Sequence, residues 1–294
     1  MARHPYGQWC DMSDPSPNAP RAAQARGASV EDDLEEAFER LVHEGEQRLG
    51  RDWIGLFSTG TVAGLEVGLG ILAMLIVDAR THDKLLGGIA FSFGFLALLL
   101  AHSELFTEGF LIPIITVTAR RATVWEVVRF WAATLVTNLF GGWVIMWLVI
   151  TAFPHLGATA EQLSGPMIHA GFGMHSFALA VLAGAAITLM TRMQHGTDAI
   201  GAKIIAAVAV AFLLSGLPLY HSILDSLIMF AALNSNHASF TYGTWARWCA
   251  WALLGNLIGG IGLVTLLRLV RVRELVALER QRGEGPRNNA ARNL

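Results

Sequence analysis

Residues 102–109 read HSELFTEG and residues 215–222 read SGLPLYHS, and each of these polar stretches interrupts a long apolar run. Glycine, proline, histidine and acidic residues fit poorly in a lipid-facing helix, because hydrocarbon offers no hydrogen-bond partner for freed backbone groups. The two stretches therefore predict membrane helices that are broken at depth. Both breaks are expected to be buried in protein or to face water.

The composition around these stretches is that of a membrane protein. Of the 294 residues, 53% are hydrophobic and 15% are charged, whereas soluble domains carry roughly 25% charged residues. The net charge of −2 argues against a nucleic-acid partner. Cys10 and Cys249 are the only cysteines, so neither a disulfide framework nor a metal site is expected. We also find no phosphate-binding loop, nucleophile elbow or zinc-protease motif, and predict a protein that is not an enzyme and needs no cofactor.

Six apolar stretches are long enough to cross the bilayer as helices, which takes about 20 residues. They predict an all-α membrane protein with six transmembrane helices, in which helices 2 and 5 contain the breaks. The predicted spans are residues 53–77, 85–117, 124–153, 171–190, 204–233 and 245–270.

The remaining segments flank this transmembrane domain, which we place at residues 51–272. Residues 1–28 are rich in proline, alanine and arginine and are expected to be a disordered tail. Residues 29–50 carry apolar residues at helical spacing and predict an amphipathic cytoplasmic helix. Residues 273–294 are expected to form a cytoplasmic C-terminal helix and tail.

Loop charges predict the orientation in the membrane. With six spans, most basic residues near the membrane fall on one side, whereas the loop after span one on the other side has Arg80 and Lys84. Because basic loops stay inside, both termini are predicted to be cytoplasmic in a multi-pass protein of the bacterial inner membrane.

Spans three and six share a phrase, Asn138-Leu-Phe-Gly-Gly142 and Asn256-Leu-Ile-Gly-Gly260. The same offset lays the first break over the second and places Ser103 against His221. These matches predict two inverted three-helix repeats, an arrangement that puts a solute site near the midplane. Helix packing would explain the glycines, but it does not explain two coincident breaks.

The residues at the breaks resemble a known family. Glu104-Leu-Phe-Thr107, His221-Ser-Ile and the paired Asn-Leu-x-Gly-Gly phrases, in this order within residues 50–272, are similar to the formate/nitrite transporters. The resemblance implies an aquaporin-like fold and a homopentamer in the lipid bilayer. It further implies that Leu105, Phe106 and Thr107 form a gating loop, and that His221 is a central histidine hydrogen-bonded to Thr107.

The function implied by the resemblance is a channel or transporter for a small monovalent anion or its conjugate acid, linked to protons through His221. An anion that enters an apolar constriction loses hydration unless it is neutralised, and a histidine can lend a proton near neutral pH. The alternative for His221 is a structural role, in which it only holds the break in shape.

Acidic residues at membrane depth leave the solute open, because such groups are costly and usually functional. Glu104 favours a structural role in satisfying loop amides. Glu66 and Asp225 could form a proton-linked network with His221 or with Arg129 and Arg247, or they could select a neutral or cationic solute such as ammonia. A non-conducting scaffold or sensor is a third alternative. The candidate pore and solute residues are Glu66, Glu104, Leu105, Phe106, Thr107, Glu108, Asn138, His221, Asp225 and Asn256.

Overall fold

The computed structural model describes residues 35–281, which are helical and contain no strand. The predicted tail at 1–28, the first residues of the 29–50 helix and the last residues of the 273–294 segment lie outside the described residues. Residues up to Glu39 and residues from Arg40 onward form two units, and the contacts below lie within the second. Helices at 35–49 and 273–281 flank these elements: α2 (Trp53–Thr81), α3 (Lys84–Ala101), η1 (Phe106–Phe110), α4 (Ile112–Thr118), α5 (Val124–Ala152), α6 (Leu156–His169), α7 (Met174–His195), α8 (Ile200–Gly216), α9 (Leu224–Leu233), α10 (Tyr242–Leu257), η2 (Ile258–Thr265) and α11 (Leu266–Arg271).

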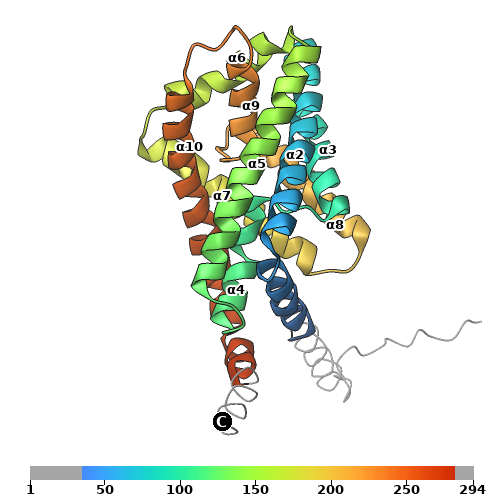
Figure 1. Cartoon of the computed structure of the whole chain (residues 1–294), viewed down its shortest axis with the longest axis vertical. Coiled ribbons are helices and arrows are strands. Elements are labelled where there is room, and N and C mark those ends of the chain that lie inside the picture. The colour runs from blue at the N-terminus through green and yellow to red at the C-terminus, as the bar shows by residue number, and fades with distance from the viewer. Residues whose placement is uncertain (1–34, 282–294) are drawn as a thin grey trace, which may run out of the picture. The chain divides into compact units, whose positions relative to one another are not determined.

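Five described helices are long and apolar enough to cross a membrane: α2, α3, α5, α7 and the continuous run from α10 to α11. The segments η1 with α4, α8 and α9 are apolar but shorter. Together α3 with α4, and α8 with α9, form the broken helices 2 and 5. The predicted all-α membrane fold with two broken spans is confirmed, and α4 and α9 lie toward opposite ends of the bundle (Figure 1).

The two breaks arise from different local chemistry. At the first break, residues 102–105, α3 ends at His102 in the left-handed conformation with φ 56°, and the His102 N–H bonds to the Leu98 carbonyl. At the second break, residues 217–223, Leu217 is extended in front of Pro218, because a proline holds the preceding residue out of the helical region. The predicted first break, 102–109, extended too far, because residues 106–109 belong to η1. The predicted second break, 215–222, began too early, because residues 215–216 belong to α8.

Close helix contacts hold the two halves in the same way. A Cβ atom on Gly64 of α2 would lie 2.3 Å from the carbonyl oxygen of Asn138 in α5. A Cβ atom on Gly184 of α7 would lie 2.1 Å from the carbonyl oxygen of Asn256 in α10. Only glycine allows these backbones to approach so closely, which is the role of small residues between membrane helices.

Two described features were not predicted. Helix α6 occupies a stretch expected to be a loop, and it packs against α9. The segment η2 is π-helical, and the Thr265 hydroxyl near its end donates to the Phe110 carbonyl at 2.8 Å. The matching part of α5 stays α-helical, so the two halves differ here.

Candidate functional site

The site is built on two buried asparagines, one for each break. The side-chain amide of Asn138 donates to the carbonyls of Gly60 (2.8 Å) and Glu104 (2.9 Å). Its carbonyl oxygen accepts the N–H of Phe106 at 2.7 Å. Since a helix break leaves backbone groups unpaired at a depth without water, Asn138 replaces the helical bonds that the first break has lost.

Asn256 makes the same three bonds at the second break. Its amide donates to the carbonyls of Ala180 and Tyr220, both at 2.8 Å, and its oxygen accepts the N–H of Ser222 at 2.9 Å. Asn138 thus brackets Leu105 and Asn256 brackets His221. The predicted register, with Ser103 opposite His221, is wrong by two residues, because the breaks and the asparagine helices repeat at different offsets.

The second break meets η1, the short helix directly after the first break, at a buried hydrogen bond between His221 and Thr107. His221 Nε2 lies 2.9 Å from Thr107 Oγ1, and His221 is 1% exposed. The other ring nitrogen, Nδ1, accepts the backbone N–H of Leu224 at 3.1 Å. Because Nδ1 is an acceptor, we assign the proton of the neutral ring to Nε2, from which it can be donated to Thr107 or to a solute.

Two buried apolar side chains directly precede Thr107 in the chain. These are Leu105 and Phe106, and the Phe106 and Phe110 rings meet edge to face with centroids 5.2 Å apart. Neither Leu105 nor Phe106 lines one of the two cavities described next.

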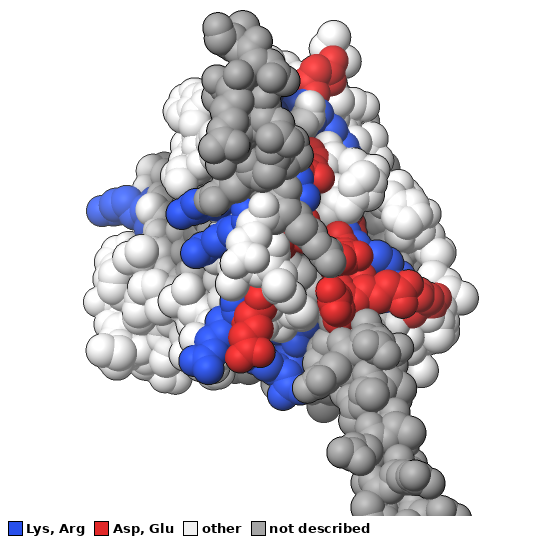
Figure 2. Space-filling view, turned by 90° about the horizontal axis from the view of Figure 1, so that it is seen from below, with Lys and Arg blue, Asp and Glu red and all other residues white. Residues whose placement is uncertain are grey.

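A polar cavity of about 560 Å³ lies at the end of the bundle that carries residues 40–51, and we call it the terminal-side cavity. Glu104, 2% exposed, contributes to its wall directly before residues 105–107. Half-buried Glu108 lines the same cavity. Acidic and basic side chains both gather on this end of the molecule (Figure 2).

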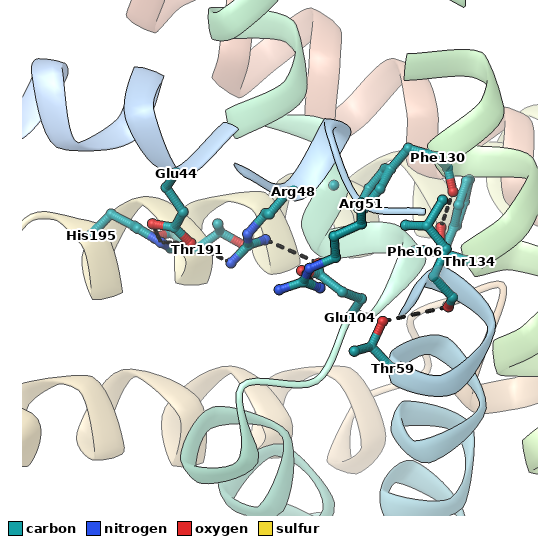
Figure 3. A network of polar contacts seen from close by, with 12 residues as sticks. Glu44, Arg48, Arg51, Thr59, Glu104, Phe106, Phe130, Thr134, Thr191 and His195 are labelled. Carbon is teal, nitrogen blue, oxygen red and sulfur yellow. Dashed lines mark hydrogen bonds and ion pairs between the residues drawn. The ribbon is translucent and has the colours of Figure 1, made fainter. Parts of the chain in front are cut away.

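Glu104 belongs to an ion-pair network formed by Glu44, Arg48, Arg51, Glu104 and His195 (Figure 3). Arg51 contacts the Glu104 carboxylate at 2.6 Å and Arg48 contacts it at 3.3 Å. Arg48 also pairs with Glu44 at 2.5 Å, and His195 Nε2 lies 3.0 Å from Glu44. The Glu104 carboxylate therefore binds arginines, which corrects the expectation that it satisfies loop amides.

The network shifts the pKa values of its members. Burial raises the pKa of Glu44, but the hydrogen bond from His195 and the charge of Arg48 outweigh burial and lower it from 4.5 to about 2. Burial lowers the pKa of Arg48, but the charges of Glu104 and Glu44 raise it overall. Both groups are thus held in their charged forms close to Glu104. Sequence reasoning missed these partners because residues 44–51 and 104 are far apart in the chain and no local pattern links them.

A second cavity, of about 160 Å³, lies at the opposite end, and we call it the far-side cavity. Asp225 and Tyr220 contribute to its wall, and Lys84 at the start of α3 lines it as well. The two cavities share no lining residue. The first break borders one cavity and the second break borders the other, and neither His221 nor Thr107 lines a cavity.

The remaining predicted acid, Glu66, is half-buried on α2 and lines neither cavity. Its side chain hydrogen-bonds to Ser103 of the first break, and its Oε2 finds no hydrogen-bond partner among residues 35–281. The predicted pairing of Glu66 or Asp225 with arginines is wrong. The Arg129 guanidinium donates to the carbonyls of Leu49 and Arg51, and Arg247 is exposed on α10.

Comparisons with known proteins agree with this geometry. The sequence profile described as formate/nitrite transporter matches residues 35–270. The inner membrane protein YfdC of Escherichia coli (strain K12) is 25% identical over 189 residues, which cover 60% of this chain and 59% of that relative.

Two solved structures share the fold. One, described as an FNT family ion channel, is 18% identical with a TM-score of 0.73, covering 80% of this chain and 98% of its own. The other, described as a pentameric formate channel with formate bound, is 21% identical with a TM-score of 0.61, covering 74% of this chain and 96% of its own. The profile match extends over most of the chain, and the chain belongs to the formate/nitrite transporter family of membrane transporters.

Proposed function

We propose that this protein passes a small monovalent anion of the formate/nitrite class, or its conjugate acid, through the pore of each protomer, with proton linkage through His221. The observation that carries the proposal is the 2.9 Å bond between His221 of the second break and Thr107 of η1, while each break borders a separate cavity.

The surroundings of the pair suit such a solute. An ionised solute beside Leu105 and Phe106 loses hydration that apolar side chains do not replace. A solute that displaces Thr107 gains the Nε2–H donor of His221, and hydrogen bonds to charged acceptors are roughly twice as strong as neutral ones. The constriction thus favours a small solute that is neutralised, or strongly hydrogen-bonded, at one point.

The proposal includes a homopentamer in a bacterial inner membrane with both termini in the cytoplasm. Arg48, Arg51 and Arg121 support this orientation, since they lie at the terminal end of the bundle and basic loops stay inside. The description of YfdC as an inner membrane protein and of one structural neighbour as pentameric point the same way. The terminal-side cavity then opens to the cytoplasm.

Solute flux into liposomes tests the proposal. Purified protein is reconstituted and offered formate, nitrite, acetate, lactate and hydrosulfide at several pH values. At least one solute should enter faster than into empty liposomes, and His221→Ala should abolish that flux. His237→Ala, at an exposed loop position, serves as the control. Correctly folded protein that carries none of these solutes contradicts the proposal.

A second candidate is a facilitator of a neutral or cationic solute such as ammonia. Asp225 favours it, because this acid is 2% exposed, lines the far-side cavity and forms no ion pair within residues 35–281. Flux of methylammonium, measured beside the anions, separates the two candidates.

A further inference from the structure

The far-side cavity is mainly apolar. Its walls come from α2, α3, α6, α8, the second break and α9, and its polar lining residues are few. The ionisable side chains among its lining residues are Lys84, Tyr220 and Asp225.

Asp225 occupies an unusual position in this cavity. It lies in the first turn of α9, directly after the second break, and its Oδ2 accepts the backbone N–H of His221 at 3.0 Å. No lysine, arginine or histidine side chain forms an ion pair with it in the described part of the chain. A helix N-terminus stabilises an ionised acid by about 1 kcal/mol, which is less than the several kcal/mol that burial of a charge costs. The uncharged, protonated form of Asp225 is therefore favoured, and this form can give a proton to an anion that enters the cavity.

The side chains of Tyr220 and His221, next to Asp225, already have hydrogen-bond partners, so Asp225 is the group best placed to exchange a proton with a solute. The Tyr220 hydroxyl already donates to the Pro166 carbonyl at 2.9 Å. Both ring nitrogens of His221 are engaged, by Thr107 and by the Leu224 N–H. Helix α6 presents Leu163, Pro166 and Met167 to the cavity, α2 presents Met74, and the Cys249 thiol of α10 faces Ser226. Lys84, exposed at the start of α3, is the one cation among the lining residues.

We infer that Asp225 is the group that protonates the solute on the far side of the constriction, with Lys84 drawing the anion into the cavity. The inference rests on the proposed function and refines its proton linkage: His221 donates a hydrogen bond to the solute at the constriction, and Asp225 supplies the proton that neutralises the solute. The O–H bond of the Asp225 carboxylic acid breaks, and an O–H bond forms on the carboxylate oxygen of a solute such as formate. The neutral acid then passes His221, and a proton from far-side water restores Asp225. One proton thus accompanies each anion, and the reverse sequence operates in the other direction.

Simultaneous measurement of formate uptake and internal pH in proteoliposomes tests the inference. Asp225→Asn keeps an oxygen for the His221 N–H but has no acidic proton. We expect its formate flux to fall by about tenfold or more, a barrier increase of about 1.4 kcal/mol, and the remainder to lose its dependence on external pH. Asp225→Glu, which restores the acid, should recover proton-coupled uptake. Lys84→Gln should raise the KM for formate about threefold at low salt, because a surface charge acts through screened attraction.

Asp78→Asn is the matched control, since Asp78 is a buried aspartate that does not line the far-side cavity. It should change neither flux nor proton coupling. If wild-type protein carries no weak acid, the proposed function and this inference both fail. If wild-type protein carries formate with protons and Asp225→Asn does so equally well, only the inference fails. Loss of methylammonium flux in Asp225→Asn with formate uptake intact also overturns it, because Asp225 then serves a cation.

Discussion

At the scale of single residues, Asn138 and Asn256 donate their side-chain hydrogen bonds to backbone carbonyl groups. Asn138 and Asn256 each use both amide hydrogens on carbonyl groups and their oxygen on an N–H. Neither amide has a free donor for a solute. Their position beside the candidate pore follows from the need to hold the breaks, and it makes them supports of Leu105 and His221.

We predict that Asn138→Ala and Asn256→Ala each lower the free energy of unfolding by about 3 kcal/mol, since a buried backbone group without a partner costs about 1–3 kcal/mol. Thermal unfolding in detergent, followed by tryptophan fluorescence, measures the loss. Asn234→Ala is the control, because this half-buried asparagine accepts only a 3.4 Å bond from Tyr242 and its side-chain nitrogen has no partner among the described residues. Equal losses of unfolding free energy in Asn138→Ala and Asn234→Ala would contradict the role of Asn138 in holding the first break.

How much of the site could be predicted also depends on single residues. The pairing of Thr107 with His221 came from the family resemblance, and the structure has that bond at 2.9 Å. The partner of His221 in the repeat was missed by two residues, since the shared Asn-Leu-x-Gly-Gly phrase reports the offset of α5 and α10 and not that of the breaks. The arginine partners of Glu104 are more than fifty positions away and left no periodic signal.

At the scale of elements, the apolar runs were predictable because the bilayer requires about 20 apolar residues per helix. The breaks were predictable because polar residues interrupt those runs. Helix α6 was not, since it has 14 residues, too few to span, and its apolar residues are mixed with polar ones. The π-helical turn at Ile258–Thr265 was hidden as well, because it shares its sequence phrase with an α-helical stretch of α5.

The ion-pair network connects the helix over residues 40–49 to Glu104, directly before residues 105–107. The pH dependence of this connection follows from Glu44. The pKa of Glu44 is lowered to about 2 in the folded protein from its usual 4.5. A lowered pKa means that the contribution to stability is fully present above about pH 4.5 and is lost as the pH falls toward 2. We predict that hydrogen exchange of residues 40–49, corrected for intrinsic rates, stays constant from about pH 7 to pH 5 and rises below about pH 4.5.

Two variants check the role of Glu44. Glu44→Gln should raise exchange in residues 40–49 already at neutral pH. Glu46→Gln is the control, since Glu46 contacts Arg121 only at 3.9 Å, and it should leave exchange unchanged. A protein whose exchange rises between pH 7 and pH 5 would instead be governed by another titrating group.

At the scale of the whole molecule, each of two inverted halves supplies one break, which a buried asparagine holds by hydrogen bonds. Each break borders its own cavity. The terminal-side cavity is rich in charges and the far-side cavity is mainly apolar. This asymmetry was not predictable from the repeat, because it depends on side chains outside the shared phrases. Because of this asymmetry, a solute that passes His221 and Thr107 moves between a charged cavity and a mainly apolar one.

The most direct measurement asks whether solute passes Thr107. Thr107→Cys, in a background without Cys10 and Cys249, is treated with a small methanethiosulfonate reagent during formate flux in liposomes. Val136→Cys, exposed on α5, is the control for modification away from the pore. We predict that modification at position 107 stops flux, that formate slows this reaction, and that modification at position 136 leaves flux unchanged. Modification at 107 with undiminished flux, or active flux during which 107 never reacts, would contradict a path between His221 and Thr107.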